Sequence, residues 1–116
     1  MKITDNALRE KIAQAMGDAD SPRILHAIRG VPKNAQEISG ETGIPLSSIY
    51  RKLAILKNAG LAYVKSFEIT QEGKRQDLFV AAVTEVRINM NGERVELELI
   101  PTHENAERLW FRLFNP

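Results

Sequence analysis

Residues 43–61 constrain the fold more than any other part of the chain, because they predict one sharply bounded helix followed at once by a strand. Pro45 suits the first turn of a helix, and Gly60 supplies the stop. Between them, apolar residues recur at i, i+4 and i+7, namely Ile49, Leu53 and Leu56. We therefore expect a helix with one buried stripe and an opposite face left free for other contacts.

That opposite face is small and polar at its start, where it carries Ser47, Ser48, Tyr50 and Arg51. A helix that enters the major groove of DNA, about 12 Å wide, needs short side chains near its N-terminus and longer hydrogen-bonding ones behind them. The pattern therefore predicts a DNA recognition helix. The alternative is an ordinary solvated helix face.

Two helices are predicted at the start of the chain from capping residues and helical spacing. Thr4 or Asp5 caps the first, which ends at Gly17. Ser21-Pro22 is a typical second start, and that helix runs to Gly30. Within it, His26 lies between apolar neighbours and is expected to be buried.

A third helix is predicted from Ala35 to about Thr42, directly before the recognition helix. Asn34 and Glu37 form the pattern of a capping box at its start, and Gly43 closes it. After residue 60 the chain becomes rich in β-branched and aromatic residues, which predicts a hairpin over 61–83 with a polar tip at 71–74.

A second hairpin is predicted around Asn91-Gly92, the preferred pair of a type I′ turn. A two-residue loop at that pair sets Met90 opposite Glu93, Ile88 opposite Val95, Val86 opposite Leu97 and Glu85 opposite Glu98. Nearly all apolar residues then lie on one face, which requires cover. Thr102 caps a last helix with a heavy apolar stripe at Ala106, Leu109, Trp110, Leu113 and Phe114.

Charge is unevenly distributed along the 116 residues, although the net charge is only +1. Residues 21–79 hold nine basic and five acidic groups, a net +4, whereas the two ends together carry −3. A positive middle between acidic flanks is typical of a segment that meets phosphates. Chance scatter on a solvated surface is the alternative.

Several function classes are disfavoured by the composition. The chain has no cysteine, which excludes disulfides and thiolate metal sites. No apolar run approaches the roughly 18 residues of a membrane span, so we expect a cytoplasmic protein without membrane contact. His103 and Glu107 have a spacing that suits half of a metal site, but an ordinary surface pair is favoured. We find no phosphate loop, activated nucleophile or metal cluster, and expect no catalytic residues, cofactor or metal.

The order of predicted elements resembles the winged helix-turn-helix regulators of the ArsR and MarR type found in prokaryotes. The likeness is carried by Gly43-Ile44-Pro45-Leu46-Ser47-Ser48-Ile49-Tyr50-Arg51-Lys52-Leu53 and by Leu56-Lys57-Asn58-Ala59-Gly60-Leu61. Over residues 21–83 it implies an α+β fold with a three-helix core and a hairpin wing, and with the N-terminal helix we expect a DNA-binding domain over residues 1–83. The hairpin and helix of residues 84–116 are then an appended dimerisation element.

The resemblance implies that residues 34–42 form the supporting helix, Leu46–Asn58 the recognition helix and Thr70–Gln76 the wing tip. Arg51 suits a bidentate contact to guanine, and Lys52 and Lys57 suit phosphates. Lys74 and Arg75 suit the minor groove. The expected DNA contacts are Lys33, Asn34, Leu46, Ser47, Ser48, Tyr50, Arg51, Lys52, Lys57, Lys74 and Arg75.

The expected function is sequence-specific binding of double-stranded DNA by a homodimeric transcriptional regulator. The alternative is a winged helix that binds protein within a larger assembly. The expected dimer interface comprises Leu8, Ile12, Leu109, Trp110, Leu113 and Phe114, with the second hairpin. A two-fold dimer sets recognition helices about 34 Å apart and implies a palindromic site. A last helix folded over its own hairpin would instead give a monomer, and no effector ligand is indicated.

Overall fold

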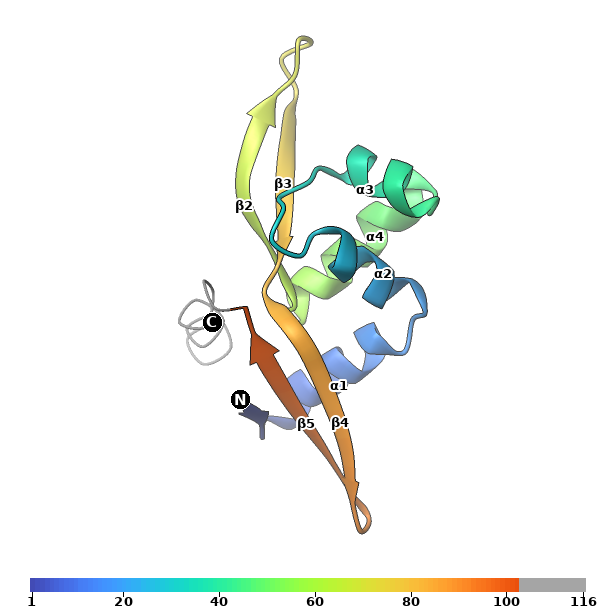
Figure 1. Ribbon diagram of the computed structural model, residues 1–116, viewed down its shortest axis with the longest axis vertical. Helices are drawn as coiled ribbons and strands as arrows, with labels where there is room; N and C mark the ends of the chain where they lie inside the picture. The colour runs from blue at the N-terminus through green and yellow to red at the C-terminus, as the bar shows by residue number, and fades with distance from the viewer. Residues whose placement is uncertain (103–116) are drawn as a thin grey trace.

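The computed structural model describes residues 1–102 of the chain, in which a short strand and four helices are followed by two β-hairpins (Figure 1). In order they are β1 (Lys2–Ile3), α1 (Asn6–Met16), α2 (Asp20–Ala27), α3 (Ala35–Thr42), α4 (Leu46–Asn58), β2 (Ala62–Ile69), β3 (Arg75–Ala81), β4 (Val83–Asn91) and β5 (Arg94–Pro101). This is the predicted α+β winged helix-turn-helix. The apolar stripe predicted after Thr102 lies outside the described residues.

Capping side chains begin α1 and α3 as the sequence predicts. The Asp5 carboxylate accepts a hydrogen bond from the Leu8 N–H at 2.8 Å. At α3 the Asn34 side chain accepts from the Glu37 N–H at 2.8 Å, and the Glu37 carboxylate accepts from the Asn34 N–H at 3.1 Å. Gly43 ends α3 with φ of 76°, a left-handed conformation that favours glycine.

The prediction that Ser21 caps α2 is wrong, because α2 begins at Asp20. Ser21 is buried and its hydroxyl donates to the Ala15 carbonyl oxygen at 2.7 Å, so it joins α2 to the end of α1. The Asp18 carboxylate accepts from the Asp20 N–H at 2.9 Å and so satisfies a donor at the start of the helix. His26, which we expected to be buried, is exposed on this helix.

One hydrophobic core joins all four helices to the bases of both hairpins. Its largest fully buried side chains are Ile12, Ile24, Ile28, Ile38, Ile49, Leu53, Leu56, Leu61 and Leu99. Ile12 is therefore not available for a dimer interface, and Leu8 packs against the same core. The interface role expected of Ile12 is therefore wrong, because one chain already covers this side chain, whereas the role expected of Leu8, which is partly buried, stays a prediction.

The two hairpins point to opposite ends of the molecule (Figure 1). β2 and β3 form a two-stranded sheet, the wing, whose base is joined to the start of α3 by a bridge between Lys33 and Phe79. β4 and β5 form a three-stranded sheet in the order β1-β5-β4. The short β1, which the sequence reading did not predict, pairs Lys2 with Glu98 and Ile3 with Leu97.

The second hairpin has a register two residues away from the predicted one. Asn91 pairs with Arg94, so the turn residues are Gly92 and Glu93 rather than Asn91 and Gly92. A type I′ turn needs positive φ at both central residues, and Gly92, at 66°, is the one residue of this turn that has it. Glu85 now faces Ile100, so the predicted clash with Glu98 does not arise. A shift of two leaves every side chain on its predicted face.

Candidate nucleic-acid interface

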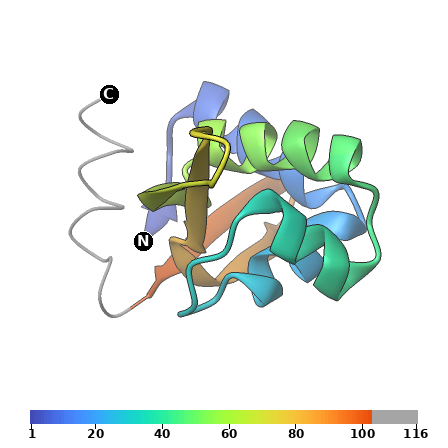
Figure 2. The same cartoon turned by 90° about the horizontal axis from the view of Figure 1, so that it is seen from above.

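The recognition helix α4 has the bounds and the buried stripe that the sequence predicts. Ile49, Leu53 and Leu56 are at most 1% exposed. Leu46 is partly buried against the same core, and Ser48 is half-buried. Ser47, Tyr50, Arg51 and Lys57 are exposed on the other side. Seen from above, with the wing toward the reader, α3 and α4 lie beside the wing (Figure 2).

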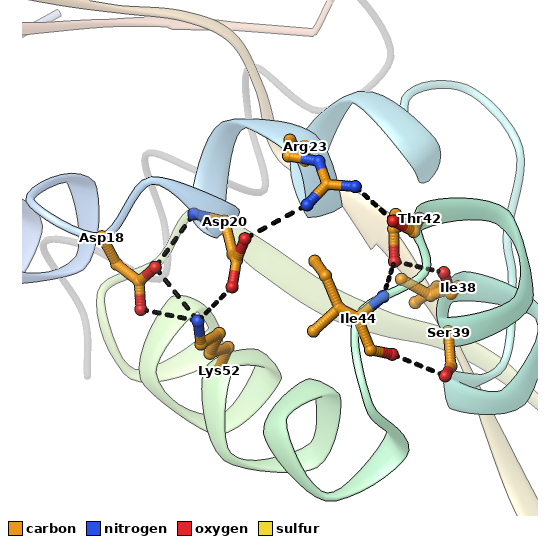
Figure 3. A network of polar contacts seen from close by, with 8 residues as sticks. All are labelled: Asp18, Asp20, Arg23, Ile38, Ser39, Thr42, Ile44 and Lys52. Atoms are coloured by element: carbon orange, nitrogen blue, oxygen red, sulfur yellow. Dashed lines mark hydrogen bonds and ion pairs between the residues drawn. The ribbon is translucent and has the colours of Figure 1, made fainter.

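Lys52 does not lie on this exposed face, which corrects its assignment as a phosphate contact. It is only 8% exposed, and its Nζ lies 3.0 Å from the Asp18 carboxylate and also pairs with Asp20 (Figure 3). Both carboxylates come from the junction between α1 and α2. The lysine therefore holds the recognition helix against that junction and has no free charge to offer a phosphate.

The three charges of this cluster stabilise one another. Hydrogen bonds with Asp20 and then Asp18 hold the pKa of Lys52 above its ordinary value. The Lys52 ammonium lowers the pKa of Asp20. The pKa of Asp18 is lowered first by the Asp20 N–H and then by Lys52. All three groups are charged at neutral pH, so the cluster is a permanent ionic brace rather than a switch.

The turn between α3 and α4 is fixed by side chains of α3 (Figure 3). The Ser39 hydroxyl donates to the Ile44 carbonyl at 2.6 Å, and the Thr42 hydroxyl accepts from the Ile44 N–H at 3.2 Å. The Arg23 guanidinium of α2 donates to the Thr42 carbonyl. Because the turn is bonded from both sides, the supporting and recognition helices are held as one unit.

Lys33 and Asn34, both expected to contact phosphates, have partners within the chain. The Lys33 Nζ pairs with the Glu41 carboxylate at 2.5 Å and donates to the Ala27 carbonyl. Besides capping α3, the Asn34 amide donates to Gln76 of the wing at 3.2 Å. The DNA contacts expected of Lys33 and Asn34 stay predictions, although both side chains already have partners within the chain. The two residues fix α3 against the base of the wing.

The outer part of the wing carries two cations, Lys74 and Arg75, together with the exposed carboxylates of Glu68 and Glu72. Lys74 is exposed at the tip, where the Thr70 N–H donates to the Lys74 carbonyl at 2.8 Å and closes the turn. The Arg75 guanidinium lies 4.2 Å from the centre of the Phe67 ring and 2.9 Å from the Asp77 carboxylate. The side chain of Arg75 is therefore held in place, and Asp77 partly neutralises its charge. No carboxylate within residues 1–102 pairs with Lys74.

A cleft separates the wing from the helices, and Tyr50 of α4, Gln36 of α3 and Arg75 and Gln76 of the wing contribute to its lining. Lys65, a cation that the sequence reading left out of the site, is exposed where β2 bulges between Val64 and Ser66. A bulge has no reliable sequence signal, so Lys65 was identifiable only as one more basic residue.

The cations of the interface therefore divide into two groups. Lys33, Lys52 and Arg75 have ion-pair partners. Within residues 1–102, no ion pair engages Arg51, Lys57 or Lys74. The predicted interface residues Leu109, Trp110, Leu113 and Phe114 lie outside the described residues.

Residues 22–64, which span α2 to the first half of β2, match the family model of the bacterial regulatory proteins of the arsR family. The chain carries a winged helix-turn-helix in which this segment is similar to the arsR regulatory proteins. This confirms the resemblance read from the sequence and supports a DNA-binding transcription regulator, a class whose members are typically not enzymes. The match ends before the tip of the wing, and the second hairpin lies beyond it.

Among solved structures, the Vibrio cholerae ferric uptake regulator (Fur) is similar, with 18% sequence identity and a TM-score of 0.41. The alignment covers 96% of this chain and 89% of that chain. No curated protein sequence matches the chain. None of the helices within residues 1–102 is long and apolar enough to cross a membrane.

Proposed function

We propose that this protein is a sequence-specific regulator of transcription that binds double-stranded DNA as a homodimer. The observation that carries the proposal is that the cations of α4, the start of α3 and the wing fall into two groups, those with an ion-pair partner and those without. Lys52 and Lys33 are used to brace the helices, while Arg51 and Lys57 of α4 and Lys74 of the wing are exposed and have no ion pair with any of residues 1–102. Unpaired cations on a braced helix and wing suit a polyanion.

The proposed docking places the exposed face of α4 in the major groove. Ser47, near the start of the helix, and Arg51, one turn later, then reach base edges, with Arg51 donating to guanine O6 and N7. Tyr50 lies toward the wing and suits a phosphate at the cleft that it lines. Lys57 near the end of α4 and Lys74 on the wing then contact the backbone on either side.

The homodimer is proposed because base contacts by one short helix read only a few base pairs. Two copies related by a two-fold axis present two recognition helices about 34 Å apart, which fits a palindromic site. The second hairpin lies at the opposite end from the wing and leaves the proposed DNA surface free (Figure 1).

Duplex binding measured against salt concentration and against sequence tests this proposal. Affinity should fall with a slope of about −0.9 in log K per log salt for each neutralised phosphate. Arg51→Ala should relax the base preference at one position of each half-site, at a cost of about 1–3 kcal/mol. Lys57→Ala should weaken all sequences alike.

Lys11→Ala is the matched control, because Lys11 is an exposed cation on α1, outside the proposed surface. It should leave both affinity and selectivity unchanged. A chain that shows no duplex affinity at low salt contradicts the DNA proposal. If Arg51→Ala leaves selectivity intact, base readout lies on another residue.

A winged helix that binds protein is the second candidate, and one observation favours it. Phe67 and Ile69 of the wing are 51% and 61% exposed, so the wing offers apolar as well as basic surface. Absence of duplex binding, together with a partner whose binding is lost on Ile69→Lys, would favour this function over the first.

A further inference from the structure

We propose that the open edge of β4 is the surface through which two copies of this chain join, pairing antiparallel into one continuous sheet. This inference rests on the homodimer of the proposed function and assigns its interface. It differs from the sequence expectation, which placed the terminal helices at the centre of the dimer.

The two edges of the three-stranded sheet are treated differently. On the β5 side, β1 pairs with residues Leu97 and Glu98, and the Arg9 guanidinium donates to the Val95 carbonyl. On the β4 side, no strand within residues 1–102 is paired. β4 is nine residues long and contains neither lysine nor proline, two residues that protect an edge from pairing, and its one bulge lies at its start, between Val83 and Glu85.

The apolar face of the same hairpin continues past the part that the chain covers. Leu97 and Leu99 are 3% and 0% exposed, but Ile88, Met90 and Val95, further toward the turn, are 55%, 80% and 44% exposed. The register places all five on one face, because Ile88 pairs with Leu97 and Met90 with Val95. A second copy that adds its strand to β4 would double this face.

Side-chain complementarity selects one register for that pairing. With the two-fold axis at Ile88, Ile88 faces its own copy and Val86 faces the partner's Met90, so apolar meets apolar. Arg87 then faces the partner's Asn89, and no like charges are opposed. An axis at Arg87 would set that arginine against itself. An axis at Val86 would leave Met90 without an exposed strand residue opposite.

In this register the tip of each hairpin also contacts the other copy. The register brings the tip of the partner's hairpin, with its Glu93, to the start of the β4 edge, where the strand bulges between Val83 and Glu85. Val83 and Thr84 line a hollow with His26 and Arg29 of the α2 region. The carboxylate of the partner's Glu93 would then lie near the Arg29 guanidinium, a favourable pairing of opposite charges. The two-fold axis repeats this contact on the other side of the dimer.

A single cysteine tests the edge, because the chain has none of its own. At the proposed axis the Ile88 Cα atoms of the two copies are about 4.5–5.5 Å apart, within the range of a disulfide. Ile88→Cys should therefore form a covalent dimer under mild oxidation, at least tenfold faster than Ile69→Cys. Ile69 is the matched control, since it is slightly more exposed on the wing, at 61%, than Ile88 is, at 55%.

Sedimentation of the unsubstituted chain at micromolar concentration accompanies the cross-linking. A dimer in which Ile88→Cys is cross-linked and Ile69→Cys is not supports the edge. A dimer in which both cysteines react equally slowly overturns the edge while leaving the homodimer in place. A monomer, including one whose residues 103–116 cover the edge, overturns both the edge and the dimer, and duplex binding then reports separately on DNA recognition.

Charge reversal gives a second, independent readout. Arg29→Glu or Glu93→Arg alone should weaken the dimer several-fold, and the two together should restore it. Both side chains are exposed, so the variants should fold, which circular dichroism checks. Failure of the double variant to recover the dimer overturns the register.

Discussion

The wing and the second hairpin each turn at a glycine with positive φ, Gly73 at 78° and Gly92 at 66°. Each also packs its base on the common core, through Val80 of β3 and through Leu97 and Leu99 of β5. They differ in what their outer parts offer. Both expose apolar side chains, but the wing places Lys74, which has no ion pair within residues 1–102, beside the proposed DNA surface, whereas the second hairpin exposes Met90, at 80%, next to the open edge of β4. Similar local chemistry thus gives two hairpins suited to different partners.

The arginines of the two hairpins are each paired with carboxylates of their own sheet. On the second hairpin the Arg87 guanidinium lies 2.9 Å from the Glu85 carboxylate and 3.1 Å from that of Glu98, and Arg87 lowers the pKa of Glu85. Its charge is therefore balanced within one face of the sheet. On the wing, Arg75 is balanced by Asp77, but Lys74 remains available. Within residues 1–102 no ion pair engages Lys74 at the tip of the wing or Arg94 at the tip of the second hairpin, so the two hairpins differ in their apolar residues more than in their charge.

The largest effect is expected from replacing the exposed apolar residues of the second hairpin by lysine. Ile88→Lys with Met90→Lys should convert the dimer to a monomer. The interface would then bring four added positive charges, two from each copy, close together around the two-fold axis. Duplex affinity should fall by about 10²–10⁴-fold as bivalent binding is lost. Sedimentation and duplex titration measure both changes.

Ile69→Lys on the wing is the control for that variant, and it should leave the dimer intact. If the double lysine variant stays dimeric, the second hairpin is not the interface. Its exposed apolar side chains then have no part in self-association.

A smaller effect is expected from removing the charge at the wing tip. Lys74→Ala removes one phosphate contact per protomer, so the magnitude of the salt slope should fall by about 1.8 for a dimer. Arg94→Ala, which removes a cation at the tip of the other hairpin, should leave the slope unchanged when dimer formation is complete. Equal slopes for the two variants would show that the wing tip does not meet the backbone.

The smallest effect is expected at the glycines of the turns. Gly73→Ala and Gly92→Ala should each lower the free energy of unfolding by about 1–2 kcal/mol, because a side chain disfavours positive φ. No atom lies within 4 Å of the added Cβ at either position, so the cost is confined to the backbone. Urea denaturation measures it.

Gly40→Ala is the opposite control for the turn variants. Gly40 lies inside α3 with ordinary φ and open space around it, so alanine should raise the free energy of unfolding by about 0.5–1 kcal/mol. A turn variant that behaves like Gly40→Ala would mean that its hairpin does not turn as described.

The elements with strong local signals were predictable from the sequence. α3 and α4 have the predicted bounds because a capping box, a proline and two glycines mark their ends within a few residues. The exposed face of α4 followed from the spacing of its buried residues. The register of the second hairpin was not predictable in this way, because Asn91-Gly92 and Gly92-Glu93 are both acceptable turns until the backbone angles are known.

The sequence by itself determined the order of the elements, the recognition helix and the side of each strand that is apolar, since these depend on residues close together in the chain. Only the tertiary structure decided which cations are free. Lys52 and Arg51 are neighbours, but Lys52 pairs with Asp18 and Asp20, 34 and 32 residues away. The tertiary structure also decided that Ile12 belongs to the core and that one edge of β4 is open. Burial and charge pairing depend on contacts between distant segments, which local spacing does not encode.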